Sequence, residues 1–600
     1  MQLIGDGWKK SDIFLALALS AAAFAVFWIS PVRQVTDSTY AMVVSQGLID
    51  NQSFQLDRFN FTVQPPHLYE YYVANGDEYQ IEQRNGHLYY FFPSGGAVLS
   101  VPFVGLMNVF GNSAVFPDGT YNRDGEVLIQ GLLSALLMGL LTGVLFLTAR
   151  LLLPFSWSLL AALGTAFGSQ IWSTTSRGLW SDTWGVLLLG FALLFVLGAE
   201  AKKIRIHPVV LASLLAWAYF CRPTYSIAVI GLGLYMFIAH RRKFVLFALT
   251  GFAWAVAFVV YAWVHFGKPL PSYYLIQLRF TVFWQSLTGN LFSPGRGLFV
   301  YVPVLLFVAY LLARFWVYVP YKRLAFVALF AIVAHLFVVG AFVHWWGGDC
   351  YGPRLTASLT PWFFLLAVLA IKAMLDWCEG NTSRLTVANW KIPLAVGSVL
   401  LAFSVFANGS GAIARDTVRW NEWVSAAAPN EGSRIWDWRY PQFLAGFRPP
   451  PPAKEFPLLS APSIIDFTRP ESEPYIWYGW SGPEPDFRWT SEKEASLVFS
   501  VNTAGPLQMT ISAAPFMAGS VVTRQRVTIL LNDKEVADFE MANSQFEGRT
   551  IVLPAGILKK QNILRFKLPD ATAPSSVSQN TDSRLLGIAV HSIEFQSGKN

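Results

Sequence analysis

The sequence predicts a polytopic α-helical membrane domain of about eleven spans, followed by an extracytoplasmic β-sandwich of jelly-roll type. Three observations lead to this prediction. Of the 600 residues, 54% are hydrophobic and only 14% are charged, whereas soluble domains carry about 25% charged residues. Apolar runs of membrane-spanning length recur up to residue 407. Beyond residue 470, short runs alternate between apolar and polar residues, as β-strands do.

The first apolar run, Ile13–Val32, is too long for a signal-peptide core and lacks a convincing cleavage site, so we expect an uncleaved first span. Several later runs are short, so tilted or re-entrant segments are expected among them. The ten further candidate spans are Val127–Ala149, Ser156–Trp172, Thr183–Leu197, Pro208–Phe220, Tyr225–Ala239, Phe244–Val264, Phe299–Leu312, Leu324–Val343, Trp362–Met374 and Pro393–Ala407.

Lysine and arginine residues orient the spans, because cytoplasmic loops are enriched in them. Five clusters alternate correctly with a cytoplasmic N-terminus: Lys9/Lys10, Arg150, Lys202/Lys203/Arg205, Arg241/Arg242/Lys243 and Lys322/Arg323. An odd number of spans then places the C-terminal domain outside. We therefore predict a multi-pass protein of the cytoplasmic (inner) membrane with a periplasmic C-terminal domain.

The predicted domains are a membrane domain at 1–410, a linker at 411–470 and the β-sandwich at 471–600. The linker contains a proline-rich stretch, Arg448–Lys454, which is expected to be extended. Within the membrane domain, residues 33–126 form an unusually large first outer loop. Its apolar stretch Gly95–Phe110 is too short to span, so it predicts one or two helices lying in the membrane interface.

Composition also excludes some classes of function. The net charge of +7 is modest and arises mostly near helix ends, so it indicates topology and no nucleic-acid partner. Cys221, Cys350 and Cys378 imply no disulfide framework. No spacing of histidines or cysteines is typical of a metal site, so none is predicted, although a divalent metal as cofactor stays open.

Two acidic residues at the outer ends of spans are the candidate catalytic groups. Asp37 follows the first span and Asp182 opens a later one. A carboxylate at such a membrane edge is suited to act as a base, and the second to orient the acceptor or to assist metal binding. The alternative for each is a structural helix cap, with Asp37-Ser38-Thr39 capping a helix that starts near Tyr40.

Arginines beside glycines at the outer face are candidate phosphate ligands, because a guanidinium binds phosphate oxygens in a bidentate manner. Arg296 and Arg354 fit this description and Arg177 fits it less well; the alternative is a side chain that reaches for lipid headgroups. Arg222 either faces a cavity or marks a turn. Candidate substrate contacts from the segment that leads to Arg354 are His344, Asp349 and Tyr351, and a structural role for His344 stays open.

These segments together resemble the GT-C superfamily of integral-membrane glycosyltransferases, over roughly residues 10–410. The chain is similar to the bacterial branch near the dolichyl-phosphate-mannose-type and aminoarabinose transferases. The segment His87–Pro102 resembles the Tyr-rich segment of that branch. The other residues that carry the resemblance are Asp37, the first outer loop, Asp182, Ser293–Gly297 and Gly347–Arg354.

The resemblance implies transfer of a sugar, with inversion, from a polyprenyl-phosphate donor to a cell-envelope glycan or lipid-linked acceptor at the outer face of the membrane. Asp37 would deprotonate the acceptor hydroxyl, with Asp182 orienting the acceptor or assisting the base. Arg296 and Arg354 would stabilise the departing phosphate. The implied partners are the donor, the acceptor and the lipid bilayer.

The chain departs from this family in one respect. Many relatives near the aminoarabinose transferases carry a Lys-Pro-Pro segment in the first loop, where the lysine meets the lipid phosphate. The matching stretch here, Phe91–Gly95, has no lysine, which shifts weight to the arginines.

The C-terminal module resembles carbohydrate-binding β-sandwiches in its aromatic opening, Tyr475–Glu484. These aromatic side chains either stack on a polymer or pack the sandwich core. Other functions considered for the whole chain are a transporter or flippase of lipid-linked sugars, an oligosaccharide ligase and a non-enzymatic glycan-binding scaffold.

Overall fold

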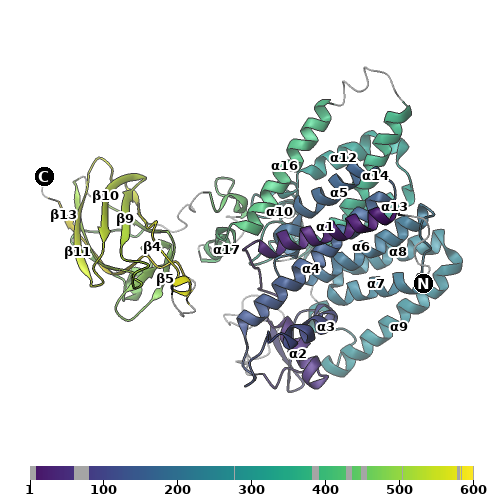
Figure 1. Ribbon diagram of the computed structural model, residues 1–600, viewed down its shortest axis with the longest axis horizontal. Helices are drawn as coiled ribbons and strands as arrows, with labels where there is room; N and C mark the ends of the chain where they lie inside the picture. Colours follow the sequence, from purple (N-terminus) through teal and green to yellow (C-terminus); the bar gives the residue numbers. More distant parts are fainter. Residues whose placement is uncertain are drawn as a thin grey trace. The chain divides into compact units, whose positions relative to one another are not determined.

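The computed structural model describes residues 8–59, 80–275, 278–342, 344–380, 391–426, 435–447, 456–502, 505–577, 582 and 584–598. The chain forms two compact units, Met1–Pro450 and Pro451–Asn600. The first unit is helical and the second consists of β-sheet (Figure 1). Each has its own hydrophobic core. The prediction of a helical N-terminal part and a β-rich C-terminal part is therefore confirmed.

In the described part of the helical unit, seven helices are long and apolar enough to cross a membrane. Four of the remaining predicted spans coincide with the shorter apolar helices α5 (Phe155–Phe167), α7 (Pro208–Cys221), α8 (Ser226–Ala239) and α12 (Val304–Arg314). The number of helices that cross the bilayer stays a prediction. The seven long helices are α1 (Lys10–Ile29), α4 (Arg123–Arg150), α6 (Ser181–Glu200), α9 (Arg241–Phe266), α13 (Lys322–Gly340), α14 (Thr360–Gly380) and α16 (Lys391–Ile413).

The long helices differ in how deeply they are buried. The apolar window of α4 is 78% buried within the protein, whereas that of α9 is only 6% buried, so α4 is central and α9 faces the surroundings. Helix α1 packs closely along α4. A Cβ atom at Gly139 of α4 would lie 2.7 Å from the main-chain oxygen of Ser20, so only glycine allows this approach.

Residues 33–126, the predicted first outer loop, contain two helices and a hairpin among those that the structure describes. Helices α2 (Ala41–Asn51) and α3 (Gly95–Val109) pack against each other at one end of the helical unit (Figure 1). Strands β1 (Ile81–Arg84) and β2 (His87–Tyr90) pair in antiparallel fashion between them in the sequence. Helix α3 covers the stretch for which the sequence predicts interfacial helices.

The segment 411–470 is more structured than the linker that the sequence suggests. Helix α17 (Asp416–Ala426) and the 3₁₀ turn η8 (Gln442–Leu444) belong to the helical unit. A small core explains this, because Trp420, Ile435 and Tyr440 bury apolar surface against Trp345. Strand β3 (Ser463–Asp466) belongs to the β unit. The proline-rich stretch lies outside the described residues.

The β unit consists of two antiparallel sheets that share one core. The first has the strand order β10-β9-β12-β7-β4; the second has the order β11-β8-β13-β6-β5, with β3 also paired to β13. The strands are β4 (Ile476–Tyr478), β5 (Trp480–Pro483), β6 (Arg488–Thr490), β7 (Glu494–Ser500), β8 (Leu507–Pro515), β9 (Gln525–Leu531), β10 (Lys534–Met541), β11 (Glu547–Leu553), β12 (Gln561–Lys567) and β13 (Ile588–Ser597).

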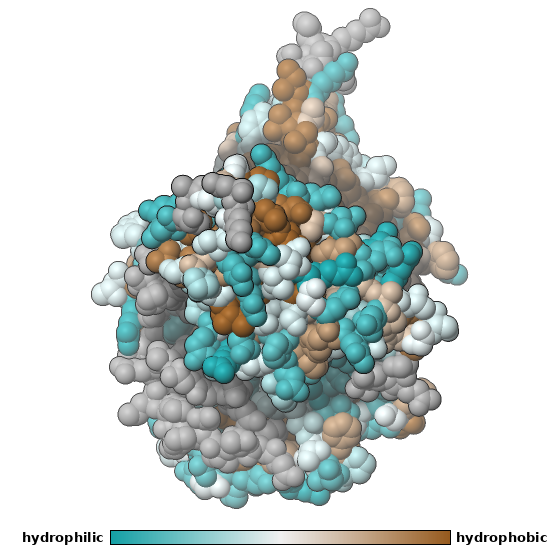
Figure 2. Space-filling model, turned by 90° about the vertical axis from the view of Figure 1, so that its left-hand side faces the viewer, coloured by the Kyte–Doolittle hydropathy of each residue, from teal (hydrophilic) through white to brown (hydrophobic). Residues whose placement is uncertain are grey.

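Local sequence explains this β architecture. Strand β9 alternates buried and less buried residues. Asn532 and Asp533 both have positive φ, as a tight two-residue hairpin turn between β9 and β10 requires. Trp480 packs 4.7 Å from Phe467, centroid to centroid, so this member of the aromatic opening belongs to the core. In Figure 2 hydrophilic residues predominate in the middle of the view, whereas apolar residues gather in its upper part.

Candidate functional site

Asp37 and Arg354 form an ion pair across 317 positions of sequence. Asp37 lies in the turn between α1 and α2, and Arg354 is the first residue of the 3₁₀ turn η7 (Arg354–Leu359) before α14. The Arg354 guanidinium lies 3.8 Å from the ring centroid of Trp180 and donates from Nη1 to the Gly347 oxygen at 2.9 Å. The side chain of Asp37 is 22% exposed and that of Arg354 only 7%, so a ligand can reach the carboxylate.

The turn that carries Asp37 is held by a buried acid on α4. The Glu126 carboxylate accepts from the main-chain N–H groups of Tyr40 and Met42, both at 2.9 Å, and thereby caps α2. Gln130 donates to the Ser38 oxygen at 2.7 Å. Asp37 is therefore not the cap of this helix, and its carboxylate reaches Arg354 instead.

A second buried ion pair joins Asp182 to Arg222. Asp182 lies in the first turn of α6 and Arg222 follows the last residue of α7. No side-chain capping bond is made at the start of α6, so the capping alternative does not describe Asp182 either. Tyr273 lies within electrostatic range of Asp37, Arg354, Asp182 and Arg222, which places the two ion pairs in one cluster.

The side chain of Arg296 is held by hydrogen bonds to the protein. All five of its N–H groups donate to protein oxygens, among them Nε to Trp346 at 2.6 Å and Nη1 to the Gln442 side chain at 2.7 Å. Arg177 is fully buried and donates to the main-chain oxygens of Phe27 and Ser30. Both arginines brace loops around the site, so Arg354 is the predicted phosphate ligand that lies beside Asp37.

The three candidate substrate contacts lie in different surroundings. His344 is half-buried and its ring lies 5.2 Å from that of Trp346. Asp349 is exposed on a loop within electrostatic range of Asp37. Tyr351 is buried, and its hydroxyl donates to the Ala407 oxygen. Of the three, Asp349 is the one that lies near Asp37 and is open to a ligand.

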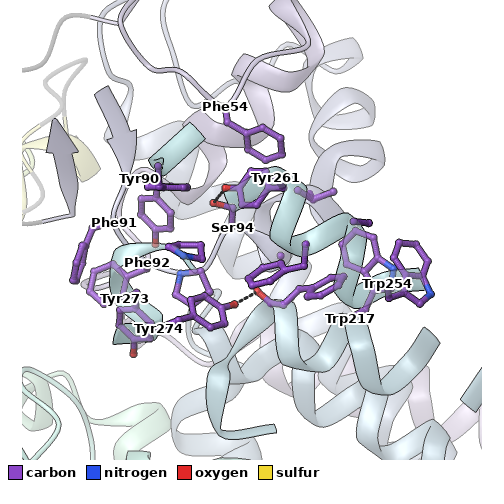
Figure 3. A pocket seen from close by; sticks show the side chains of 18 residues that line it. Phe54, Tyr90, Phe91, Phe92, Ser94, Trp217, Trp254, Tyr261, Tyr273 and Tyr274 are labelled. Atoms are coloured by element: carbon purple, nitrogen blue, oxygen red, sulfur yellow. Dashed lines mark hydrogen bonds between the residues drawn. The ribbon is translucent and has the colours of Figure 1, made fainter. Parts of the chain in front are cut away.

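A cavity of about 250 Å³ adjoins the charged cluster (Figure 3). Tyr90 and Tyr273 line the cavity and also contact the charged cluster. The Tyr90 hydroxyl donates to the Asp37 main-chain oxygen at 2.7 Å, and Tyr273 lies near the charged side chains of both ion pairs. Burial raises the pKa of Tyr90 and of Tyr273, so both phenols stay neutral. The cavity is lined by Phe54, Tyr90, Phe91, Phe92, Pro93, Ser94, Gly95, Val98, Trp217, Phe220, Trp254, Ala257, Phe258, Tyr261, Phe266, Pro271, Tyr273 and Tyr274.

The cavity wall is largely apolar, because three of its four tyrosines form hydrogen bonds to the protein through their hydroxyl groups. Tyr261 bonds Ser94 at 3.3 Å and Tyr274 donates to the Phe220 main-chain oxygen at 2.9 Å. The rings of Phe220 and Phe258 stack at 4.8 Å. Such a wall suits a hydrocarbon chain better than a sugar.

Sequence reasoning missed Trp180 and Tyr273 and left Arg222 open. Trp180 and Tyr273 carry no local signal, since aromatic residues are common throughout this chain. Arg222 did offer one, an arginine followed by proline at the outer end of an apolar run. In the described ranges, no group of three or more His, Cys, Asp or Glu side chains could hold a metal ion.

Comparisons with known proteins give no assignment. No protein-family model matches the chain, and no curated protein matches it. Several solved structures are similar to it, three of them with TM-scores of 0.35 or below. The arabinosyltransferase EmbB from Mycobacterium smegmatis is 12% identical, with a TM-score of 0.35, over 98% of this chain and 65% of that one.

The other two similar structures act on or bind carbohydrate by their descriptions. A family 35 carbohydrate-binding module from an environmental isolate is 15% identical, with a TM-score of 0.13, over 21% of this chain and 82% of the module. A family GH115 4-O-methyl-alpha-glucuronidase with specificity for decorated arabinogalactans is 14% identical, with a TM-score of 0.16, over 35% of this chain and 29% of the enzyme. At these TM-scores the functional conclusion has to rest on the site itself.

Proposed function

We propose that the chain is an inverting glycosyltransferase that moves a sugar from a polyprenyl-phosphate donor to a hydroxyl of a cell-envelope glycan or lipid-linked acceptor, at the outer face of the membrane. The observation that carries this proposal is the position of Asp37. Its partly exposed carboxylate is paired with Arg354 and adjoins an aromatic cavity through Tyr90. A base, a cation and an apolar channel are the three elements that this reaction needs.

In the proposed reaction, Asp37 accepts the proton of the acceptor hydroxyl as its oxygen attacks the anomeric carbon. The bond from that carbon to the phosphate oxygen breaks on the opposite face of the sugar, which inverts its configuration. The polyprenyl phosphate leaves with the bonding electron pair and needs no proton, because it is a stable anion at neutral pH.

Arg354 links the donor to the base in this proposal. An incoming phosphate competes with Asp37 for the guanidinium, because both are oxyanions that bind its N–H groups. As the guanidinium turns toward the phosphate, the Asp37 carboxylate is released from its ion pair and can accept a hydrogen bond from the acceptor hydroxyl. Arg354 then stabilises the charge that develops on the leaving phosphate. Donor binding would thus free the base, while Arg296 and Arg177 hold the loops around it.

The aromatic cavity is assigned to the first isoprenoid units of the donor. Trp254, Phe258 and Tyr261 contribute to its lining from α9, the least buried of the long helices. A lipid-borne substrate could therefore enter from the bilayer between α9 and its neighbours. The phosphate would then lie beyond Tyr90 and Tyr273, near Arg354.

The test is substitution of Asp37 by asparagine in the full chain. Asparagine can still accept a hydrogen bond from Arg354, so the protein should fold, whereas transfer from a polyprenyl-phosphate sugar to envelope acceptors should fall about 10²- to 10⁴-fold. Asp118→Asn, in the exposed part of the same loop, is the control and should keep full activity. Full activity of Asp37→Asn would contradict the proposal. So would movement of lipid-linked sugar across liposomes without a new glycosidic bond, which is the result expected of a transporter.

A further inference from the structure

Four polar atoms in the charged cluster are buried and have no hydrogen-bond partner among the residues that the structure describes. They are Nε1 of Trp180, Oδ1 of Asp182, the hydroxyl of Tyr225 and Nε of Arg354. Each of these residues is more than nine-tenths buried. Buried polar atoms in proteins are almost always hydrogen-bonded, and leaving one unpaired costs about 1–3 kcal/mol. Four such atoms close together therefore point to a ligand that completes them.

The contacts between these residues bring the four atoms to one place. Trp180 and Asp182 stand two positions apart at the start of α6, and Arg354 packs on the Trp180 ring at 3.8 Å. The other carboxylate oxygen of Asp182 pairs with Arg222. Tyr225 packs on α6 one turn further along, because a Cβ atom at Gly185 would lie 2.6 Å from its hydroxyl oxygen.

The charge and the bonding character of this group indicate the kind of ligand. Two carboxylates, Asp37 and Asp182, balance two guanidinium groups, Arg222 and Arg354. On the α6 side of the cluster, Asp182 and Arg222 balance each other's charge, so a neutral ligand group can be held there by hydrogen bonds. The unpaired atoms include N–H donors, a carboxylate acceptor and a hydroxyl that can do both. This mixture matches the hydroxyl groups of a sugar ring, which donate and accept in turn.

We propose that Trp180, Asp182, Tyr225 and the Nε of Arg354 form the subsite that recognises the hydroxyl groups of the donor sugar. This proposal rests on the proposed function and deepens it, because it separates sugar recognition from the binding of phosphate and lipid chain. Asp182 is then a residue that selects the donor sugar, in place of the acceptor-orienting role suggested by the resemblance. The subsite stands on the side of the cluster formed by α6 and the end of α7.

Binding measurements on the full chain in detergent or nanodiscs test the subsite. The probes are farnesyl phosphate and farnesyl-phosphate-linked glucose, mannose, arabinose and ribose. The wild-type chain should bind one of the sugar-bearing probes more tightly than farnesyl phosphate. Tyr225→Phe removes one hydroxyl group at nearly constant shape, whereas Trp180→Phe removes the indole N–H together with one ring of the side chain. Each should weaken binding of that probe about tenfold, since one well-placed hydrogen bond has roughly that effect, and should change binding of farnesyl phosphate less than twofold.

Matched substitutions away from the subsite serve as controls. Tyr219 lies on α7 outside the cluster, and the side chain of Trp284 is exposed. Tyr219→Phe and Trp284→Phe should therefore leave the affinities for all probes unchanged. Equal losses for farnesyl phosphate and for the sugar-bearing probe, no loss for either, or no preference of the wild-type chain for any sugar would each overturn the subsite.

Deoxy analogues of the preferred sugar give a second measurement, which uses the wild-type chain and so does not depend on whether a variant folds. Removal of at least one hydroxyl group should weaken binding to the wild-type chain about tenfold, and insensitivity at every position would overturn the subsite. The proposed function fails separately. Absence of transfer by a chain that binds the sugar selectively would reject the reaction but keep the subsite, whereas transfer without sugar selectivity would do the reverse.

Discussion

At the scale of single residues, the outer-face arginines show that partners decide the role of a side chain. Arg296 and Arg354 occur in similar glycine-rich segments and are both buried. Arg296 places all its N–H groups on protein oxygens and holds the loop that contains Trp346 and Gly348. Arg354 donates from one nitrogen to a carboxylate beside a cavity, and its Nε has no partner in the described part of the chain. The hydrogen bonds of Arg296 stabilise the fold, whereas the position of Arg354 allows it to contact a substrate.

Lysine substitutions should separate these two roles. Arg296→Lys keeps the charge but has three donors in place of five, so several buried oxygens lose a bond and the free energy of unfolding should fall by about 2–4 kcal/mol. Arg354→Lys keeps a cation for Asp37 and should unfold near the wild-type temperature, while its transfer rate falls at least tenfold. Thermal unfolding and the activity of the folded fraction, measured on both variants, check this. Equal stability loss in the two variants would contradict it.

At the scale of elements, the apolar runs gave the helices, because membrane-spanning length is a property of a local stretch of sequence. The structure of the turn after α1 could not be predicted from local sequence in the same way. Its helix cap comes from Glu126, 86 positions after Tyr40, so local spacing could not decide between a capping and a catalytic Asp37. The pairing of Asp37 with Arg354 depends on how α1, α4 and α14 pack, which no local pattern encodes. The segment that contains Trp420 and Tyr440 is polar in composition, which predicts a linker. These two residues nevertheless form a small core with Trp345.

Glycines at helix contacts allow a test of this packing. A Cβ atom at Gly185 of α6 would lie 2.2 Å from the Tyr225 ring, so Gly185→Ala should push that ring away and lower the free energy of unfolding by about 1–3 kcal/mol. It should also lower transfer activity, because Arg222 and Tyr225 belong to the same short segment. Gly251→Ala on α9 is the matched control. Nothing lies within 4 Å of its Cβ position, so stability should stay equal or rise by up to about 1 kcal/mol, as measured by thermal unfolding.

At the scale of the whole molecule, the candidate site and the lysine-rich loops occupy opposite ends of the helices. Asp182 and Glu126 lie in the first turns of α6 and α4, whereas Arg150 ends α4 and Lys203 follows the end of α6. The two helices therefore run in the same direction. The positive-inside rule predicts that the basic ends lie in the cytoplasm and that both ion pairs lie at the outer face. A donor phosphate would have to be presented from the outer leaflet.

Cysteine labelling in intact cells tests this orientation. In a chain carrying Cys378→Ser, which leaves only the buried Cys221 and Cys350, single cysteines are introduced at exposed positions as Pro117→Cys, Arg205→Cys and Ser520→Cys. A maleimide that cannot cross membranes should label the first and third in intact cells, because the first outer loop and the β unit are expected outside. Arg205→Cys, in a basic loop, should react only after permeabilisation. Labelling of Arg205→Cys alone in intact cells would put Asp37 and Asp182 on the cytoplasmic side, where an outer-leaflet donor could not reach them.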